Sequence, residues 1–326
     1  MLVRNSSSVA LAVDSRVVDD VDLIALAMSD GLSAEYVQLE SSPFRGRWTA
    51  IHAAPVVAQF GSHEIAVVRR VRVPPDRCAF MVPLAVPAAA RWNGRAVRAE
   101  DIIVCPPRSE CLAFDPPSTQ FAILTVGTTA PVLRAAGSLL ASSAGAPLTA
   151  RCGSEARVLC ERLICVRNAA ESRHLSALSE VDLNLAAALR ACLERWADGC
   201  GDVASLDGRS RIVRRVEEFL RSHVSEGVSV AQLSTVAGVS ERSLRNAFYD
   251  VYTTSPKRYM TLWQLHQVRR TLRSADAAAA TVTAAATCHG FYELGRFAGA
   301  YKSLFGEAPS QTLSRAKRQH GLEGAA

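Results

Sequence analysis

From about Val56 to Val126, hydrophobic residues form short runs that Pro and Gly interrupt, and no helical periodicity separates the runs. Many short strands with frequent turns are typical of a β-sandwich or barrel and not of a parallel βαβ sheet. The pattern therefore predicts strands within 63–73, 79–86, 101–107 and 119–126.

The stretch 91–114 is similar to the turn–strand–turn core of a cupin-like barrel. Gly94 is expected at a hairpin tip, and Pro106 with Pro107 is expected to end the buried strand. We assign residues 1–150 to this domain. A barrel of this kind can hold a small organic ligand in its mouth.

Between Ser154 and Ala197, apolar residues recur at steps of three and four, which predicts two helices. The second helix has one apolar stripe, formed by Leu178, Val181, Leu185, Leu189, Cys192 and Trp196. Two interpretations stay open: the stripe packs on the barrel, or it pairs with a second subunit as in a short coiled coil. Residues 151–197 are thus a packing or dimerisation segment, and the polar, Gly-rich stretch 198–210 is the expected linker.

Helical periodicity takes over at Arg209. Ser229 and Gln232 have the spacing of a capping box, which opens a short helix after Ser229. Gly238 is expected to end this helix in a left-handed conformation. Ser240 can cap the next helix, whose inward positions are Leu244, Ala247 and Phe248. Two short helices joined by a tight Gly-containing turn predict a helix-turn-helix unit.

The same unit recurs, because Val282 to Gly290 repeats the spacing of Val230 to Gly238. Phe297, Ala300, Tyr301 and Leu304 form the inward face of the following helix. One long helix, 256–272, is expected to bridge the two units, with six residues available for packing: Tyr259, Leu262, Trp263, Leu265, Val268 and Leu272. The second helices of the two units, 240–251 and 292–304, could enter successive major grooves if they lie about 34 Å apart.

Charge separates the two halves of the chain. The 326 residues have a formal net charge of +6, but residues 1–208 carry −2 and residues 209–326 carry +8. A basic C-terminal half indicates a polyanion-binding part. The hydrophobic fraction of 49% is enough for a proper core and excludes wholesale disorder.

Several classes of site are not expected. The front half has no His-x-His pair followed by Glu, so we expect no metal and no cofactor. His63 and Glu64 would point to opposite faces of a strand, and we interpret His63 as a surface histidine on an edge strand. The nine cysteines are interpreted as buried apolar residues in a reducing, cytoplasmic compartment. Neither a membrane span nor an enzymatic constellation of residues is present in the sequence.

The two helical units resemble the paired motifs of AraC/XylS-family transcription regulators. The match covers residues 209–315 and includes Gly290-Phe291, the Gly-Arg-Phe core 295–297 and the Phe-Gly-x-x-Pro ending 305–309. The resemblance implies an all-α DNA-binding domain, 211–318, behind a cupin-like effector-binding and dimerisation domain, and hence an α+β chain of two domains. The sequence departs from the family pattern at two positions: Ala284 stands where an acidic capping residue is usual, and Ala285 where a larger aliphatic residue is usual.

The candidate DNA-binding residues lie on the two expected reading helices. On the first, Arg242, Arg245, Asn246 and Tyr249 share the face opposite the core, next to the cap Ser240. Arg suits bidentate contact with guanine and Asn with adenine. The outward positions Gly295, Ala298 and Gly299 of the second helix offer little for base contact, which leaves Tyr292, Glu293, Arg296 and Lys302. The first helix is therefore expected to carry most of the specificity.

The candidate ligand-binding residues of the front half are Phe80, Arg91, Trp92, Arg108 and Phe114. We interpret the chain as an effector-responsive activator that acts as a homodimer on promoter DNA, with RNA polymerase and a small organic effector as further partners. The alternative is a DNA-binding protein whose barrel only dimerises or binds a protein partner. An apolar cavity with convergent polar groups would favour the first interpretation, and a well-packed interior the second.

Overall fold

The computed structural model describes residues 2–4, 10–28, 30–137, 140, 145–172, 185–200, 208–223, 228–274 and 281–323. The chain groups into two compact units. Unit 1 comprises residues 1–36 and 44–207, and unit 2 comprises residues 208–326 together with the short segment Val37–Pro43. The linker expected at 198–210 lies partly outside the described residues, because 201–207 are not among them.

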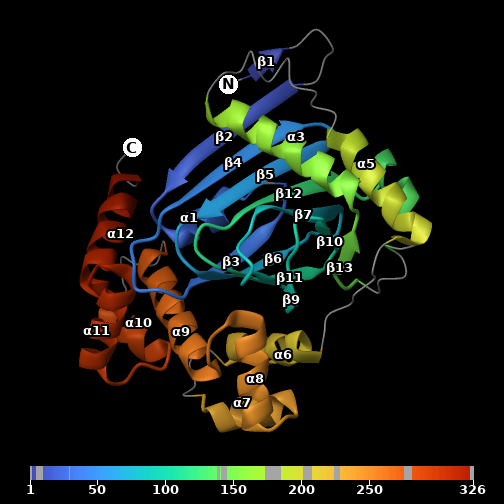
Figure 1. Cartoon of the computed structure of the whole chain (residues 1–326). Helices are drawn as coiled ribbons and strands as arrows, with labels where there is room; N and C mark the ends of the chain where they lie inside the picture. The colour runs from blue at the N-terminus through green and yellow to red at the C-terminus, as the bar shows by residue number, and fades with distance from the viewer. Residues whose placement is uncertain are drawn as a thin grey trace. The chain divides into compact units, whose positions relative to one another are not determined.

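Unit 1 is built on two antiparallel sheets (Figure 1). The larger sheet has eight strands in the order β1 (Leu2–Arg4), β2 (Ala10–Val18), β4 (Gly46–Ala53), β5 (Val56–His63), β12 (Gln120–Gly127), β7 (Arg77–Ala85), β10 (Asp101–Cys105) and β13 (Leu148–Arg151). The smaller has five, in the order β3 (Ser33–Gln38), β6 (Val67–Arg72), β11 (Glu110–Asp115), β8 (Arg91–Trp92) and β9 (Arg95–Ala96). The expected barrel or sandwich is therefore an open two-sheet arrangement.

Strand alternation in the larger sheet divides the core of unit 1 into two layers. On β7, Phe80 belongs to one buried cluster and its neighbour Met81 to the other. On β12, Leu124 and Ile123 divide in the same way, because successive side chains of a strand point to opposite faces. One layer fills the space between the sheets, and the other lies under helices. Both faces of the larger sheet are thus covered, which explains its nearly continuous apolar strands.

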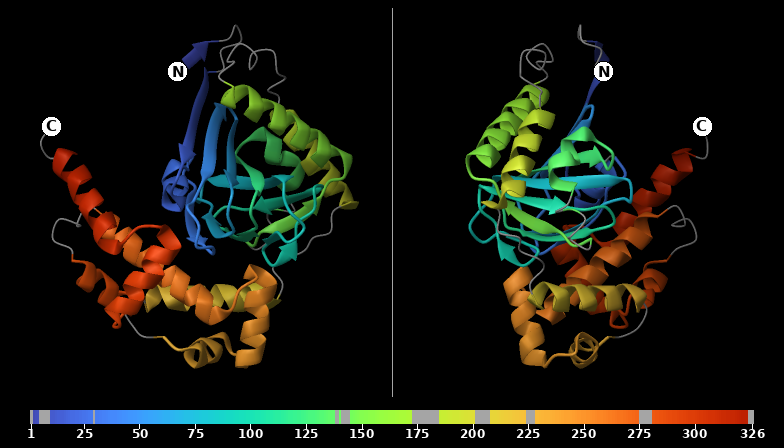
Figure 2. Two further views of the ribbon diagram at one scale, coloured as in Figure 1. Left: turned by 60° about the vertical axis from the view of Figure 1, so that its left-hand side comes forward. Right: turned by 90° about the vertical axis from the view of Figure 1, so that its right-hand side faces the viewer.

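Two helices cover the outer face of the larger sheet, as Figures 1 and 2 show: α3 (Ser154–Glu171) and α5 (Leu185–Arg195). The two expected helices are confirmed, and α5 continues as a π-helical turn, η2 (Trp196–Cys200). The stripe residues Leu185, Leu189, Cys192 and Trp196 are buried in the core of unit 1, while Leu178 and Val181 lie outside the described residues. These four side chains therefore pack inside unit 1, as the first of the two interpretations expects.

Local turn signals placed several elements correctly. Asn93 and Gly94 both have positive φ and form the tip between β8 and β9, and Pro106 follows the end of β10 directly. The run 63–73, expected as one strand, is the end of β5, a turn and β6. The remaining elements of unit 1 are the helix α1 (Val21–Ala27) and the 3-10 turn η1 (Pro131–Ala136).

Beyond Val37–Pro43, the described part of unit 2 is all helical. Its helices are α6 (Gly208–Ser222), α7 (Val230–Ala237), α8 (Glu241–Tyr252), α9 (Pro256–Arg273), α10 (Val282–Cys288), α11 (Leu294–Phe305) and α12 (Pro309–Glu323). The expected long bridging helix is α9, and all six packing residues expected for it are buried. Ser255 caps its N-terminus by accepting a hydrogen bond from the Arg258 backbone N–H at 3.3 Å.

No helix in the described ranges has both the length and the apolar character needed to cross a membrane. Five of the described cysteines are buried, as expected: Cys78, Cys105, Cys111, Cys152 and Cys192. Cys165 and Cys288 are exposed, however, so the interpretation of all nine as buried residues is wrong.

Candidate nucleic-acid interface

The first helix-turn-helix unit of the molecule, lobe 1, comprises α6, α7 and α8. The side chain of Ser229 accepts from the Gln232 backbone N–H, and Gln232 accepts from the Ser229 backbone N–H, which completes the expected capping box. Gly238 has φ +68° and ψ +33°, the left-handed conformation that lets the chain turn. Ser240 then caps α8 by accepting from the Ser243 backbone N–H at 3.2 Å. The local sequence therefore sets the angle of α8.

The recognition face of α8 lies opposite its buried side. Leu244, Ala247 and Phe248 are fully buried. The four candidate residues on the other side are all exposed: Arg242, Arg245, Asn246 and Tyr249. They project from a helix whose N-terminal N–H groups favour anions such as phosphate. The arrangement presents donors for base edges on one continuous surface.

A buried carboxylate holds lobe 1 to the bridging helix. Glu217 on α6 accepts a hydrogen bond from Tyr252 of α8 at 3.0 Å and a short one from Tyr259 of α9. The rings of Tyr252 and Tyr259 stack with centroids 5.1 Å apart, and Phe248 packs 5.5 Å from Tyr259. One acidic group thus joins three helices, since each hydroxyl needs a partner once it is buried.

The second helix-turn-helix unit, lobe 2, comprises α10, α11 and α12. Thr281 caps α10 by accepting from the Ala284 backbone N–H at 3.1 Å, and Gly290 has φ +84° in the turn that follows. Thr281 thus supplies a cap although Ala284 lacks the family's acidic side chain. His289 ends α10, where burial lowers its pKa and Thr271 Oγ1 lies 2.8 Å from its Nε2.

The outer face of α11 is almost bare. Gly295, Ala298 and Gly299 are exposed, and a Cβ added at either glycine would meet no atom within 4 Å. Arg296 is exposed and forms an ion pair of 2.9 Å with Glu293. The remaining candidates, Tyr292 and Lys302, are exposed as well. Every candidate DNA-binding residue, including Ser240, whose hydroxyl caps α8, is thus exposed to solvent. The exposed face of α8 carries more polar side chains than the exposed face of α11.

Lobe 2 is anchored to α9 through aromatic and charged side chains. Phe297 packs on Phe291 and on Tyr301, and Tyr301 packs on Phe305. The guanidinium carbon of Arg269 on α9 lies 4.5 Å from the Phe305 ring centre, and Arg269 pairs with Glu307 at 3.3 Å. α11 is thereby held on a core that is as aromatic as the core of lobe 1.

One basic surface was missed from the sequence. α12, the last helix of lobe 2, exposes Arg315, Lys317 and Arg318 within four residues. The signal was present as the run Arg-Ala-Lys-Arg at 315–318. These side chains suit phosphate contacts, which position a protein on DNA without reading its sequence.

A family model described as a helix-turn-helix domain matches residues 233–315. The Rhodococcus erythropolis protein described as a probable thc operon regulatory protein is 39% identical over 102 residues, 31% of each chain. The Pseudomonas putida XylDLEGF operon transcriptional activator is 37% identical over 105 residues, 32% of this chain and 33% of that one. The matches thus span about a third of these relatives. The chain carries an AraC/XylS-type helix-turn-helix domain.

Solved structures of the same type also match. The AraC/XylS-type domain aligns with a probable AraC family regulator from Rhodopseudomonas palustris, at 37% identity, 32% coverage of this chain, 96% of that chain and a TM-score of 0.30. A structure of ToxT from Vibrio cholerae O395 aligns over 87% of this chain and 98% of its own, at 11% identity and a TM-score of 0.29. The two curated relatives named here are described as an operon regulatory protein and an operon transcriptional activator.

The candidate ligand-binding residues lie outside the AraC/XylS-type domain, and unit 1 pairs Arg91 with Phe114 across strands β8 and β11 but separates Phe80 from Trp92. Phe80 is buried under the helical layer, whereas Trp92 is buried between the sheets. Phe114 is buried, Arg91 donates to the carbonyl oxygens of Ala88 and Ala90, and Arg108 is an exposed loop residue with φ +61°. Ligand contact by these five stays a prediction.

A buried ion pair occupies the space between the sheets. Arg69 Nε donates to Asp115 Oδ2 at 2.8 Å, and Trp92 Nε1 donates to Asp115 Oδ1 at 2.7 Å. Burial opposes ionisation of the Asp115 carboxyl, but the Arg69 charge and nearby His63 hold its pKa below the ordinary value. The Arg69 guanidinium carbon also lies 3.8 Å from the Phe121 ring centre. This network places paired charged and polar groups within the apolar layer between the sheets.

His63 corrects one expectation. It is buried, its Nδ1 lies 2.8 Å from the Ile65 carbonyl oxygen, and its strand β5 pairs with β4 on one side and β12 on the other. The interpretation as a surface histidine on an edge strand is therefore wrong. In the described ranges, no three His, Cys, Asp or Glu side chains are grouped to hold a metal ion.

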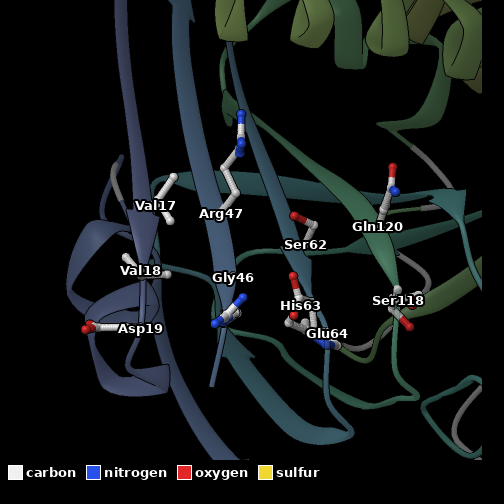
Figure 3. Close-up of a pocket in the computed structure, with 12 residues that line it drawn as sticks. Val17, Val18, Asp19, Gly46, Arg47, Ser62, His63, Glu64, Ser118 and Gln120 are labelled. Carbon is white, nitrogen blue, oxygen red and sulfur yellow. The ribbon is translucent and has the colours of Figure 1, made fainter. Parts of the chain in front are cut away.

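A pocket of about 580 Å³ opens at one end of the larger sheet of unit 1. Twelve residues line it: Val17, Val18, Asp19, Arg45, Gly46, Arg47, Ser62, His63, Glu64, Ser118, Thr119 and Gln120. Figure 3 shows Arg47 and Gln120 on the two sides of Ser62. Arg47 pairs with Glu171 at 3.2 Å, and Gln120 accepts from Arg167 at 2.7 Å, so residues of α3 fix both side chains.

Proposed function

We propose that this chain is a transcription regulator that binds DNA sequence-specifically through its AraC/XylS-type domain. The observation that carries the proposal is the exposed face of α8, where Arg242, Arg245 and Asn246 stand side by side on a capped helix. Arg pairs bidentately with guanine and Asn with adenine in the major groove. The net charge of +8 over residues 209–326 supports binding to a polyanion.

In this proposal the two recognition helices have different tasks. α8 reads bases, with Tyr249 placed for apolar contact, whereas α11 holds the DNA backbone through Arg296 and Lys302. Arg296 already pairs with Glu293 on the surface, and the bare positions beside it offer no donors for base edges. Tyr292 is 68% exposed just before this helix, and we assign it a contact with the sugar–phosphate backbone.

We propose activation as the regulatory effect, with RNA polymerase as the protein partner and a homodimer as the active species. The matched Pseudomonas putida relative is a transcriptional activator, which supports the first part of this proposal. Since the matched region is about a third of that protein, the effect of the whole chain needs its own test. Because the α5 stripe is buried in unit 1, a dimer would form through another surface.

A small organic effector in unit 1 is the proposed signal. The pocket at the sheet end has the volume of a small-molecule site, and its rim combines Arg45 and Arg47 with Asp19 and Glu64. Such a ligand would regulate DNA binding only if it had different affinities for two arrangements of the protein. Thermal unfolding of the wild type and of Arg47→Ala, with and without a panel of organic acids, sugars and amines, tests this part.

A second candidate for unit 1 is supported by its interior. The Arg69–Asp115–Trp92 network occupies the space between the sheets, where a cupin-like barrel would hold a ligand. In that case unit 1 serves only for dimerisation or for a protein partner. An increase in unfolding temperature by a panel compound that is lost in Arg47→Ala would exclude this second candidate.

The main proposal is tested by selecting bound sequences from a randomised DNA library with the full chain, followed by a salt titration on the selected duplex. We expect a bipartite site and a steep loss of affinity with salt, because several phosphate contacts release counterions. Arg245→Ala should lose the preference at one position, whereas the matched control Arg95→Ala, on exposed strand β9 of unit 1, should keep it. Equal binding to all sequences would contradict the proposal.

A further inference from the structure

A short segment from early in the chain belongs structurally to unit 2. Val37–Pro43, which we call the strap, begins with the last two residues of strand β3 but groups with residues 208–326. The sequence pattern predicts these residues to belong to the domain 1–150. Their side chains and backbone contact α9 and α11, the bridging helix and the second recognition helix.

Gln38 makes most of the hydrogen bonds that hold the strap in place. It is only 1% exposed. Its side-chain nitrogen Nε2 lies within hydrogen-bond distance of three carbonyl oxygens, those of Glu40 at 2.7 Å, Ser42 at 2.9 Å and Leu304 at 2.8 Å, and its two N–H groups donate to these three acceptors, one N–H being shared. The first two bonds fold the strap around its own glutamine. The third ties the strap to α11.

The bond from Gln38 supplies a donor to a carbonyl group at the C-terminal end of α11. The last four carbonyl groups of a helix have no partner within the helix, and Leu304 lies in the last turn of α11. Gly306 N–H already satisfies the Lys302 carbonyl at 2.9 Å. Gln38 satisfies the Leu304 carbonyl in the same turn, so a residue distant in sequence completes the C-terminal end of the second recognition helix.

The strap is fixed to α9 at two places. The Gln38 backbone N–H donates to His266 Nε2 at 2.9 Å, which requires a lone pair on that nitrogen. The His266 ring is buried and packs at right angles on Phe305, 5.0 Å between ring centres. In the first turn of α9, Arg258 donates to the Leu39 carbonyl at 2.9 Å. These contacts lie eight residues apart, about 12 Å along a helix.

A smaller contact completes the attachment. Ser303 Oγ on α11 donates to Ser41 Oγ at 3.3 Å. Ser41 and Ser303 also line a pocket of about 480 Å³ together with Lys257, Arg258 and Leu262 of α9. The strap therefore contacts both α9 and α11 beside this pocket.

We propose that Gln38 is a positioning residue for DNA recognition: through the strap it holds α11 at a fixed place on α9, and so sets the spacing at which α8 and α11 meet successive grooves. This inference rests on the proposed function. Its physical basis is that α9 contacts both parts. Tyr259, near the start of α9, bonds to lobe 1, and His266, further along α9, accepts a hydrogen bond from the strap. Because all three neighbours of the Gln38 nitrogen are carbonyl oxygens, which only accept, the orientation of the buried amide is fixed.

The test uses the full chain and the duplex selected by the wild type, with the two half-sites moved apart or together by one base pair. We expect the wild type to lose affinity about tenfold on the altered duplexes, an effect comparable to that of a mismatched base pair. Gln38→Glu has the same shape but replaces the NH₂ donor by a carboxylate, which only accepts. It should show a spacing penalty of about threefold or less, with unchanged base preference at the α8 half-site.

Gln264→Glu is the matched control, because it makes the same change of charge on a half-buried position of α9. It should keep the full spacing penalty. A Gln38→Glu protein with the wild-type penalty would overturn the inference. So would an equal loss of affinity on every duplex, including one that holds the α8 half-site alone. Failure of the wild type to select any sequence would instead contradict the proposed function.

A second variant changes only two exposed serines, Ser41 and Ser303. Ser41→Cys combined with Ser303→Cys places two thiols where hydroxyl oxygens lie 3.3 Å apart, so that mild oxidation can lock the strap on α11. We expect the oxidised protein to keep its affinity and spacing penalty, with each single variant as control for the exposed Cys165 and Cys288. Loss of DNA binding on oxidation, restored by reduction, would overturn the inference, because the strap would then have to leave α11 during binding.

Discussion

The two recognition helices occupy equivalent places in their lobes but present different surfaces. α8 begins at a serine whose side chain caps it and exposes Arg242, Arg245, Asn246 and Tyr249. α11 begins at Glu293, which forms no such side-chain cap, and exposes two glycines and an alanine on its outer face. Both helices are anchored on aromatic clusters. The difference therefore lies in what each helix offers to DNA and not in how firmly it is packed.

The largest expected effect tests whether the two cores are equivalent. Phe248→Ala and Phe297→Ala each remove a fully buried ring, and we expect each to lower the free energy of unfolding of its lobe by about 3–5 kcal/mol. Hydrogen exchange of the amides of α8 and α11 measures the two lobes separately. Tyr249→Ala, on the exposed face of α8, is the control and should change stability by about 0.5 kcal/mol or less. Loss of protection in only one lobe would show that the cores differ.

The second prediction tests the division of tasks. Arg245→Ala should reduce discrimination against one base pair by about 1–3 kcal/mol, because a bidentate contact is lost. Arg296→Ala should weaken binding to all sequences to a similar degree and reduce the slope of affinity against salt. Competition binding with single-base variants of the selected duplex measures both. If Arg296→Ala changed the preferred sequence and Arg245→Ala did not, the assignment would be reversed.

A smaller effect is expected at the bare face of α11. Gly299→Ala should stabilise lobe 2 by about 0.5–1 kcal/mol, because alanine loses less conformational entropy in a helix and its Cβ meets nothing within 4 Å. Gly306→Ala is the informative counterpart: its φ is +72°, a conformation that costs about 1–2 kcal/mol with a Cβ. Urea unfolding measures the change in the free energy of unfolding of each variant, which should be positive for Gly299→Ala and negative for Gly306→Ala. A destabilised Gly299→Ala would mean that α11 is not open at this position.

The smallest expected effect is a pH dependence confined to lobe 2. Burial lowers the pKa of His289 in the folded state below its ordinary value of 6.5. The stabilisation of lobe 2 by neutral, buried His289 is therefore fully present above pH 6.5. It is lost as the pH falls through the lower pKa of the folded state. Hydrogen exchange should show lobe 2 opening more readily on acidification than lobe 1. His289→Gln should abolish that difference, and its persistence in the variant would assign it to another group.

Much of the recognition surface could be predicted because its causes are local. A Ser with Gln three residues later, a Gly at the end of a short helix and a repeated eight-residue spacing each act within one or two turns. These signals located α7, α8, α10 and the exposed faces of the reading helices. The tip at Gly94 and the strand end before Pro106 were correct for the same reason.

The failures concern long-range placement. His63 sits in a sequence that alternates like any half-buried strand, but β4 and β12 flank its strand on both sides and bury it. The candidate ligand residues Phe80 and Trp92 are both apolar and close in sequence, yet the larger sheet separates them. Which strands pair, and on which side of a sheet a residue falls, depends on partners that no local pattern names.

By itself the sequence determined the helix-turn-helix repeat, the caps and turns that shape it, and the residues that its outer faces expose, because periodicity and capping are properties of neighbouring residues. Tertiary structure decided that the α5 stripe packs inside unit 1, that Arg69 and Asp115 fill the space between the sheets, and that Gln38 completes α11 from more than 250 residues away. Contacts between distant segments follow from packing the whole chain, where burial forces each polar group to find a partner.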